Sequence, residues 1–450
     1  MDFAFASQSA QRTDDVANTS ERLVNLYPEP AASGSKAGLT LRSVLGLEAF
    51  AELGFSLARA VIELNGVFYV VASGRLFSVT SAGVVTQLAT LLDDAETALS
   101  SNGASVTIAA GGTYYVWNGS ALLTPGSGRI TNVGWVDFHD GYTILIDKDS
   151  GEFEWTTLAD PTTRNALYFA EAESQNDKLR RSQINGKEVW LFGERSSEVW
   201  QNTGQSGANA FRNVTAIDRG ILGRNLAGKI AEVQVMVGDD GVAYQIIGFQ
   251  MSPISTPAVE NAIAESTPTH VVVYEERGRK FAGVRFADRP AWFFDFTTRR
   301  WHERASGIYE DAFTVLDTTK LGNFWYGLTG DGLLRKFNRT NMDGSTPLVR
   351  SMQSRPIRRG GEWVTVDEVQ LFAQVGSSDI GRDAQVALQI SRDGGATWEP
   401  EQWRSLGSLG QYQKEVEWHA QGAGREMALR FVVTDPTEVN LYGVGRVEVS

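Results

Sequence analysis

The chain of 450 residues contains no cysteine and few histidines. The absence of cysteine excludes disulfides, thiolate metal sites and a cysteine nucleophile, and it suits a reducing compartment such as the cytoplasm. The histidines are scattered, at His139, His270, His302 and His419. Because no H-E-x-x-H spacing places two of them on one helix face, we read them as ordinary strand or loop residues and expect no metal ion and no cofactor.

Long apolar runs and a surplus of basic residues are also missing. No run approaches the roughly 18 apolar residues of a membrane span, and MDFAFASQSAQRTDD has no basic region followed by an apolar core. We therefore expect neither membrane insertion nor a signal peptide. The formal net charge is −13, which argues against a general nucleic-acid binder because neutralising phosphates needs surplus Lys and Arg. An acidic surface would still suit a conduit through which DNA slides.

Glycines and aromatic residues, by contrast, are abundant and recur in a pattern. Between residues 55 and 345 the chain repeats a turn with Gly, an apolar strand, a second turn and an aromatic-rich strand, as in NGVFYVVASGRLFSV, DGYTILIDKDSGEFEWTTL and NGKEVWLFGERSSEVWQNTG. There are about seven such units at spacings of roughly 30 to 50 residues, the period of propeller blades. Residues 55–345 are therefore predicted to form a β-propeller, in which closure of the ring covers the faces of each blade.

The flanking segments differ from these repeats. Residues 1–54 are irregular, and Pro28 and Pro30 force extended backbone, which predicts an N-terminal extended arm laid on another surface. Residues 350–450 contain longer alternating strands such as EWVTVDEVQLFAQV and REMALRFVVTD, which predict a C-terminal β-sandwich. The fold class is therefore all-β. Three helical insertions are expected: DPTTRNALYFAEAES with Asp160 as N-cap, PAVENAIAE with Pro257 in its first turn, and a short one after Leu91 in LLDDAETALSS.

One motif in the predicted sandwich suggests chemistry. The residues of SRDGGATW fit S-x-D-x-G-x-T-W, the Asp-box pattern familiar from sialidases, through Ser391, Asp393, Gly395, Thr397 and Trp398. An alternating strand precedes them, so we interpret the box as a structural hairpin turn, and the alternative is a sugar site. A sialidase would also need several boxes, an arginine cluster and a Tyr with an acid partner, and these are not found. We therefore assign no catalytic, cofactor-binding or metal-ligating residue.

Three basic clusters have two interpretations. They are KLRR at 178–181, TTRR at 297–300 and RPIRR at 355–359. Such residues can contact DNA or an acidic partner, but more often they guard strand edges against pairing.

Several stretches occur in an order that resembles a known family. They are LVNLYPEP, LTLRSVLGLE, LYFAEAESQND, RGILG, QMSPIS and the closing SRDGGATWEPEQW with VGRVEVS. In these stretches and in total length the chain resembles the packaged-DNA stabilisation proteins of short-tailed bacteriophages, the tail accessory or hub factors. The motifs are short, so their order carries more weight than any one of them.

The resemblance implies a structural virion protein of the tail, assembled in the host cytoplasm, and not an enzyme. It implies a homo-oligomeric ring, a hexamer, that docks beneath the portal or head–tail adaptor, extends the DNA channel and helps retain the packaged DNA. Tail needle, tailspike or fibre proteins would attach to it, and DNA would pass without sequence-specific binding. The alternative is a carbohydrate-binding or glycoside-cleaving propeller, such as a receptor-binding tail component, and a generic propeller scaffold is a third reading.

Overall fold

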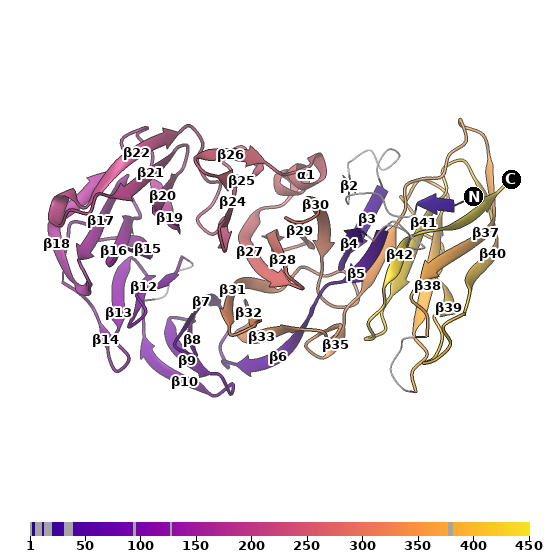
Figure 1. Cartoon of the computed structure of the whole chain (residues 1–450), viewed down its shortest axis with the longest axis horizontal. Coiled ribbons are helices and arrows are strands. Elements are labelled where there is room, and N and C mark those ends of the chain that lie inside the picture. The colour runs from indigo at the N-terminus through magenta and orange to yellow at the C-terminus, as the bar shows by residue number, and fades with distance from the viewer. Residues whose placement is uncertain are drawn as a thin grey trace.

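The computed structural model describes residues 2–4, 11–12, 20–30, 39–92, 96–126, 128–376 and 381–450. The molecule is elongated, with a ring of sheets at one end and a sandwich of two sheets at the other (Figure 1). No helix in these ranges is both long and apolar enough to cross a membrane.

Seven four-stranded antiparallel blades build the ring. The first three blades are β7 (Ala58–Leu64), β8 (Val67–Ala72), β9 (Arg75–Thr80) and β10 (Val85–Thr90); β11 (Ala98–Ser101), β12 (Val106–Ala110), β13 (Thr113–Trp117) and β14 (Leu122–Leu123); and β15 (Val133–His139), β16 (Tyr142–Asp147), β17 (Glu152–Thr157) and β18 (Asp160–Glu171). The fourth and fifth are β19 (Leu179–Asn185), β20 (Glu188–Gly193), β21 (Ser197–Asn202) and β22 (Phe211–Ile217); and β23 (Ala227–Ile230), β24 (Val233–Val237), β25 (Ala243–Ile247) and β26 (Gln250–Pro253).

The sixth blade is β27 (Pro268–Glu276), β28 (Arg279–Phe286), β29 (Ala291–Asp295) and β30 (Arg300–Arg304). The seventh combines β31 (Val315–Leu321), β32 (Phe324–Thr329) and β33 (Leu333–Asn338) with β6 (Gly46–Glu52) from the N-terminal region. The first strand of each blade contacts the first strand of the next, from β7 through β31 and back to β7. The ring is therefore closed, and the predicted propeller is confirmed.

Local sequence explains the blades. Asn65 and Gly66 have φ values of 54° and 84°, the left-handed pair that a tight hairpin turn requires between two twisted strands. Aromatic residues then fill the space between blades. Phe153 of blade 3 meets Trp200 of blade 4 with ring centroids 4.9 Å apart and nearly perpendicular planes, a favourable edge-to-face geometry. The recurring glycines of the sequence thus form the hairpin turns, and the recurring aromatic residues pack between neighbouring blades.

The sandwich consists of two sheets. One contains β4 (Leu26–Pro30), β5 (Leu39–Ser43), β42 (Leu441–Val449), β37 (Val364–Ala373) and β40 (Val416–Gly424), with β1 (Asp2–Ala4) beside β42. The other contains β3 (Ser20–Val24), β36 (Arg350–Gln353), β41 (Ala428–Val433), β38 (Gln385–Ser391) and β39 (Gln402–Ser405), with β2 (Gln11–Arg12) beside β3. The predicted C-terminal sandwich is confirmed. Short strands β34 (Met342–Asp343) and β35 (Thr346–Pro347) lie next to β6.

The two parts share a sheet and a core. β3 pairs in parallel with β30, so the second sandwich sheet and blade 6 form one sheet of ten strands. One apolar cluster contains Trp190 of blade 4, Trp301 of blade 6 and Trp418 of the sandwich. The propeller and the sandwich are therefore joined as one packed body.

The N-terminal segment is more integrated than an arm laid on a finished surface. Within residues 1–54, β3, β4 and β5 are sandwich strands, and β6 is the fourth strand of the last blade. The boundary drawn at residue 54 therefore does not separate two units of the fold. The remainder of the arm, residues 5–10, 13–19 and 31–38, lies outside the described residues.

The three expected helical insertions have different outcomes. In LLDDAETALSS, residues 93–95 lie outside the described residues, and Ala98–Ser101 form the strand β11. PAVENAIAE is the helix α1 (Pro257–Glu265), which begins with a proline as predicted. DPTTRNALYFAEAES is not helical, because residues 160–171 form the outer strand β18. Asp160 still accepts a hydrogen bond from the backbone N of Thr162 at 2.9 Å, but pairing with β17 decides the backbone conformation. A single-turn 3-10 helix, η1 (Gly207–Asn209), is the other helical element among the described residues.

Candidate functional site

The Asp-box segment forms a turn whose polar groups bind one another. Asp393 accepts hydrogen bonds from the backbone N of Thr397 at 2.9 Å and from its hydroxyl at 2.6 Å. The hydroxyl of Ser391 donates to Asp393 at 2.6 Å and accepts from the backbone N of Gly395 at 2.7 Å. Desolvation tends to raise the pKa of Asp393, but the hydrogen bonds from Ser391 and Thr397 outweigh it and lower the pKa to about 2. The carboxylate is therefore ionised and engaged within its own turn.

Trp398 attaches this turn to the sandwich. Its ring lies under the guanidinium of Arg430 from β41, 4.0 Å from the ring centroid. The backbone N of Glu399, after the turn, donates a hydrogen bond to the carbonyl of Ile390, before it, at 2.8 Å. Trp398 precedes the next strand, β39, which begins at Gln402. These contacts link the turn to the sheet without involving a ligand.

The four histidines lie apart; His139 and His302 are buried, His270 is partly buried and His419 is exposed. His139, His270, His302 and His419 are on β15, β27, β30 and β40. Burial lowers the pKa of His270 and of His302 to about 3, so both rings are neutral near neutral pH. Across the described ranges, no group of three or more His, Cys, Asp or Glu side chains has the arrangement of a metal site.

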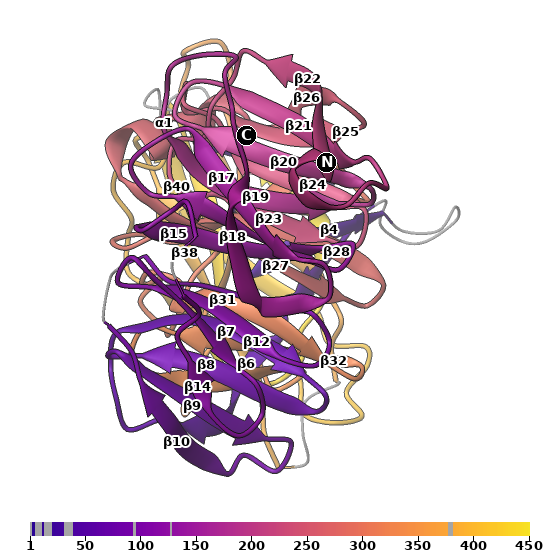
Figure 2. The ribbon, with the colours of Figure 1, turned by 90° about the vertical axis from the view of Figure 1, so that its left-hand side faces the viewer.

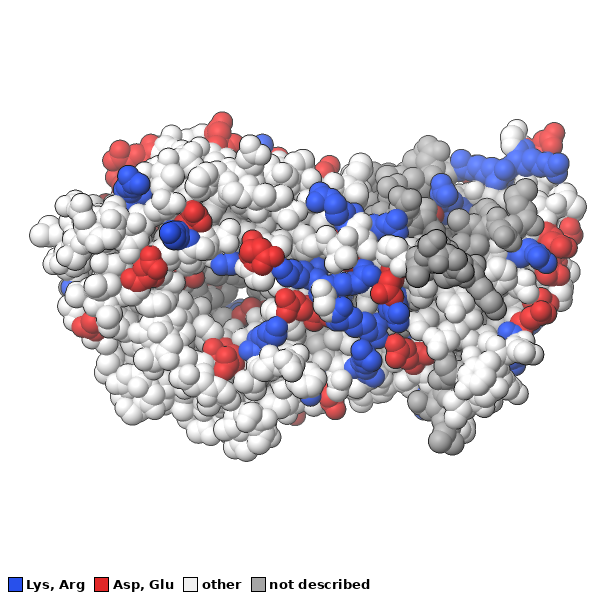
Figure 3. Space-filling view, viewed as in Figure 1, with Lys and Arg blue, Asp and Glu red and all other residues white. Residues whose placement is uncertain are grey.

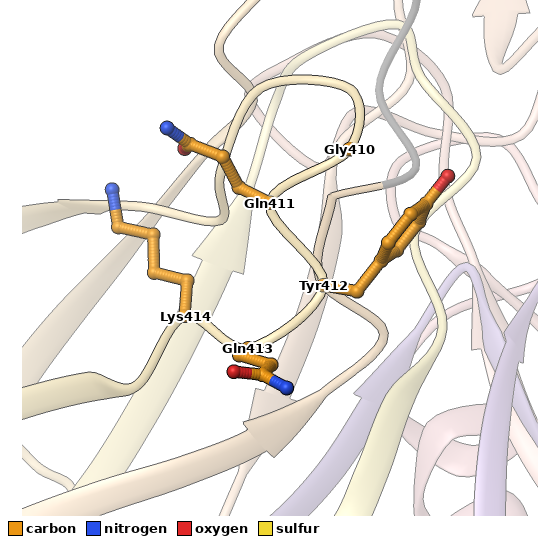
Figure 4. A pocket seen from close by; sticks show the side chains of 5 residues that line it. All are labelled: Gly410, Gln411, Tyr412, Gln413 and Lys414. Atoms are coloured by element: carbon orange, nitrogen blue, oxygen red, sulfur yellow. The ribbon is translucent and has the colours of Figure 1, made fainter.

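A surface hollow of about 560 Å³ is lined by the loop from Gly410 to Lys414. Figure 4 shows that the side chains of Gln411 and Lys414 extend to one side of the loop and that of Tyr412 to the other. Catalysis by an acid–base pair needs two converging titratable groups, and Lys414 alone among these lining residues carries a charge. The hollow therefore lacks the arrangement of an active site.

The strongest concentration of buried polar contacts lies where the arm, the propeller and the sandwich meet. Arg22 on β3 binds Glu303 at 2.5 Å and Glu310 at 2.9 Å. Burial opposes the charge of Arg22, but the two carboxylates hold its pKa above the usual value. This triad fastens the sandwich strand β3 to blade 6 and to the connection that follows it.

Asn25, directly after β3, is fully buried and has φ 54°. Its amide nitrogen donates to the carbonyls of Ala305 at 3.1 Å and Val349 at 2.8 Å, and its side-chain oxygen accepts from the backbone N of Ala305 at 3.1 Å. Its own backbone N donates to the carbonyl of Glu303 at 2.9 Å. One side chain thus connects the arm, the end of blade 6 and the linker to the sandwich.

Arg304, at the end of β30, is 1% exposed and lies within a group of aromatic rings that we call the Arg304 cage. The distances from its guanidinium carbon to the ring centroids are 4.8 Å, 5.9 Å, 4.8 Å and 5.0 Å for Tyr274, Phe293, Phe313 and Phe337. These rings come from blades 6 and 7 and from the connection between them. Cation–π attraction in such a desolvated setting exceeds that at a surface.

The Arg304 cage also holds the segment that leads into β6. Arg304 donates to the carbonyl of Leu45 at 2.6 Å, and the backbone N of Leu45 donates to Glu276 at 3.0 Å. Burial raises the pKa of Glu276, and Arg304 acts in the opposite direction. The backbone N and the carbonyl of Leu45 are therefore both bound by charged side chains. Sequence reasoning did not identify Arg304 or Asn25.

Lys and Arg side chains gather on one face where the propeller meets the sandwich, interspersed with Asp and Glu (Figure 3). Ion pairs at this junction join Arg279 to Glu29 and Asp295, Arg277 to Glu438, and Lys280 to Glu232, at 3.3, 2.7, 2.8 and 2.6 Å. Arg42 also pairs with Glu29. Because Arg42, Arg277, Arg279 and Lys280 already have carboxylate partners, these four residues offer little free positive charge for phosphates.

The three basic clusters predicted from sequence lie in different places. In the first, Arg180 pairs with Glu194 at 3.0 Å, whereas Arg181 faces the propeller axis. In the second, Arg299 and Arg300 stand at the turn between β29 and β30. In the third, Arg355 and Arg358 pair with Glu21 and Glu426 at 3.4 and 3.3 Å. The clusters do not combine into one surface.

Charged residues line the propeller axis, where Figure 3 shows a hollow. Arg181 on β19 is attracted to both Asp137 on β15 and Asp317 on β31, which lies on the far side of the ring. Its guanidinium stacks 4.2 Å over Trp135 and donates to the carbonyl of Ala227 at 2.8 Å. The centre of the propeller is thus occupied by its own side chains.

Asp137 predicts a pH dependence of stability. Burial raises its pKa to about 6, although Arg181, Ser182 and Trp135 act to lower it. The folded state binds the proton of Asp137 more tightly than the unfolded state does. Protonated Asp137 therefore contributes to the free energy of unfolding below about pH 4, and this contribution is lost as the pH rises through about 6. Asparagine does not titrate, so Asp137→Asn does not lose this contribution. The free energy of unfolding of the variant minus that of the parent should therefore rise by up to about 3 kcal/mol between about pH 4 and 7. Urea titrations across this range measure it.

Asp367, an exposed residue of β37, provides the control for this experiment. Solvent screens an exposed carboxylate, so the difference in free energy of unfolding between Asp367→Asn and the parent should stay constant across this pH range. A constant difference for Asp137→Asn as well would contradict the prediction.

Comparisons with known proteins support the two-part architecture. Residues 9–333 match the sequence model of the domain described as bacteriophage P22 Gp10, beta-propeller, and residues 350–450 match that of bacteriophage P22 Gp10, beta-sandwich. A search of curated proteins gives no match.

Similar solved structures are distant. BamB from Moraxella catarrhalis shares 11% identity over 71% of this chain and 97% of that chain, with a TM-score of 0.40. The WD40 beta propeller domain of Doa1 shares 12% over 65% and 97%, with a TM-score of 0.42. The computationally designed Ika8 protein shares 14% over 71% and 99%, with a TM-score of 0.42. Similarity at this level carries no argument about function.

Proposed function

Since the chain belongs to the bacteriophage P22 Gp10 stabilisation family and is a structural protein of the phage virion, we propose that it forms the tail hub. In this proposal six copies form a ring that docks below the portal or head–tail adaptor protein, and assembly takes place in the host cytoplasm. The ring extends the DNA channel and helps to retain the packaged DNA. It also carries the tail needle, tailspikes or fibres.

The observation that best supports this role is the continuous sheet of ten strands that joins blade 6 to the sandwich. A ring wall must transmit load between neighbours without bending at a hinge. The shared sheet, the Arg22 triad and the Arg304 cage all oppose movement of the propeller against the sandwich. Loops on such a rigid scaffold offer many attachment points for other tail proteins.

Charge supports the proposed relation to DNA. The net charge is −13, and Arg277, Arg279 and Lys280 near the junction are paired with carboxylates. Such a surface repels phosphates and does not neutralise them. The proposed channel therefore lets DNA pass without sequence-specific binding.

We propose no enzymatic role. Ser391, Asp393, Gly395 and Thr397 bind each other in the Asp-box turn, and Trp398 packs under Arg430. A glycosidase needs two carboxyl groups that flank the scissile bond, and this turn offers one carboxylate, already engaged. We assign these five residues a structural role, with no cofactor and no metal.

Imaging of virions tests the proposal. Particles assembled with the protein should show a ring of six copies between the portal region and the distal tail proteins. Particles made without it should package DNA and then lose it, which a nuclease-protection assay measures. A location elsewhere in the virion, or hydrolysis of a host polysaccharide by the purified protein, would contradict the proposed function.

A further inference from the structure

A groove of about 610 Å³ opens at the end of the propeller far from the sandwich. It lies between β18 of blade 3 and β21 and β22 of blade 4, the strands that face the viewer in Figure 2. Its aromatic wall is formed by Phe169 and Trp200, and its acidic groups are Glu171, Glu173 and Glu198. Aromatic surface beside carboxylates is a suitable receptor for a guanidinium or an indole.

Glu198 gives the groove a negative charge that the chain itself does not neutralise. It is 2% exposed and accepts hydrogen bonds from the backbone N of Ser174 at 2.8 Å, from the Trp200 indole at 2.8 Å and from the Asn213 amide at 2.6 Å. All three donors are neutral, and within the described residues Glu198 forms no ion pair. A buried carboxylate without a cation is costly, so a cation from outside would be bound favourably.

The rim of the groove already binds one guanidinium. Arg129 lies 4.6 Å over the ring of Phe169 and pairs with Glu152 at 2.7 Å. The same combination of ring and carboxylate is present deeper in the groove, where Trp200 lies beside Glu198 and where Glu171 and Glu173 are exposed. The chemistry of the groove therefore favours an arginine-bearing segment.

The sandwich end of the same chain carries such a segment. The loop of residues 355–363, RPIRRGGEW, ends in Trp363, which is 63% exposed. Arg359 is exposed, and no ion pair of Arg359 occurs in the described part of the chain, whereas Arg358 pairs with Glu426. Arginine and tryptophan are the residues that most often dominate the binding energy of interfaces. We call this segment the RPIRR loop.

On the basis of the proposed hub ring, we propose that the RPIRR loop of one copy docks into the blade 3/4 groove of the next copy. The contact joins two different surfaces, and such a contact builds a ring when the rotation from one copy to the next divides a full turn evenly, as the proposed six-copy ring requires. At a net charge of −13, copies repel one another over most of their surface. A basic loop that meets an acidic groove therefore selects this orientation over others.

Cysteine crosslinking tests the contact, because the natural chain has no cysteine. Ser174 lines the groove and Glu362 lies in the RPIRR loop, and both are exposed. Virions assembled with the double variant Ser174→Cys and Glu362→Cys should give, on mild oxidation, a ladder of disulfide-linked oligomers that ends at the closed ring. Each single variant should give no ladder.

Charge reversal supplies the second arm of the experiment. In the double-cysteine background, Arg359→Glu or Glu173→Arg should lower the crosslink yield at least about tenfold, equivalent to a loss of about 1.4 kcal/mol. The two reversals together should restore it. Arg339→Glu, at an exposed position on the propeller, should leave the yield unchanged.

The outcomes separate this contact from the proposed function. A ring in imaged virions without a crosslinked ladder, or without rescue by the combined reversal, overturns the docking of the RPIRR loop and leaves the hub ring in place. Virions that contain the protein but no ring overturn both. A ladder with rescue supports the contact.

Discussion

Arg304→Ala should lower the free energy of unfolding by about 3 to 5 kcal/mol, since it leaves a cavity among four rings and removes one of the two cations, Arg304 and Arg277, that favour the charged form of the buried Glu276. The carbonyl of Leu45 loses its donor at the same time. Urea unfolding followed by tryptophan fluorescence measures the loss. The double variant Arg304→Met and Glu276→Gln should lose less than Arg304→Ala, because it removes both charges and keeps the volume.

Lys336→Ala is the matched control. Lys336 lies 3.5 Å over the ring of Phe324, which is 45% exposed. A surface cation–π contact contributes about 0.5 to 1 kcal/mol, so this variant should lose no more than that. Equal losses for Arg304→Ala and Lys336→Ala would show that the Arg304 cage does not stabilise the closure of the ring.

Asn25→Ala should lower the free energy of unfolding by a similar amount, about 3 to 5 kcal/mol. The substitution leaves the carbonyls of Ala305 and Val349 and the backbone N of Ala305 without partners, and a buried unsatisfied group costs about 1 to 3 kcal/mol. Alanine also adopts the left-handed conformation at φ 54° less readily than asparagine does. Because these bonds join the arm, blade 6 and the linker, calorimetry should show the sandwich and the propeller separating into two transitions.

Asn65→Ala controls for the backbone conformation alone. Asn65 also has φ 54°, but it stands in an exposed turn and makes one side-chain hydrogen bond, to the carbonyl of Gly103 at 3.3 Å. Asn65→Ala should therefore lower the free energy of unfolding by about 1 kcal/mol. If Asn25→Ala lost no more than Asn65→Ala, the buried hydrogen bonds would not be what holds the junction together.

Local sequence patterns were sufficient to predict the main features of the fold. A blade is a short meander, and its turns and alternating aromatic residues lie close together in sequence, as in the Phe153 strand. The helix prediction for residues 160–174 was wrong because Asp160 and Pro161 also suit the start of a strand. Only pairing with β17 distinguishes the two.

The junction could not be predicted in the same way, because its partners are far apart along the chain. Arg22 binds Glu303, 281 residues away, and Asn25 binds Val349, 324 residues away. Nothing in the neighbouring residues marks Arg304 as buried, since RRWHERAS reads as a polar turn and strand. The Asp-box residues were found because their spacing is local, and their contacts stay within that turn and its sheet.

The last strand of the ring, β6, comes from the N-terminal region of the chain, and this affects folding during synthesis. β6 leaves the ribosome before any blade, yet it must wait for β33 before it can pair, and β5 must wait for β42 at the other terminus. Blades 1 to 6 can form in order while the chain grows, whereas the final blade waits for β33 and the sandwich sheet that contains β5 waits for β42. Pairing between such distant segments is slow. Newly made chains therefore pass through a period in which the N-terminal strands are open to association with other nascent chains.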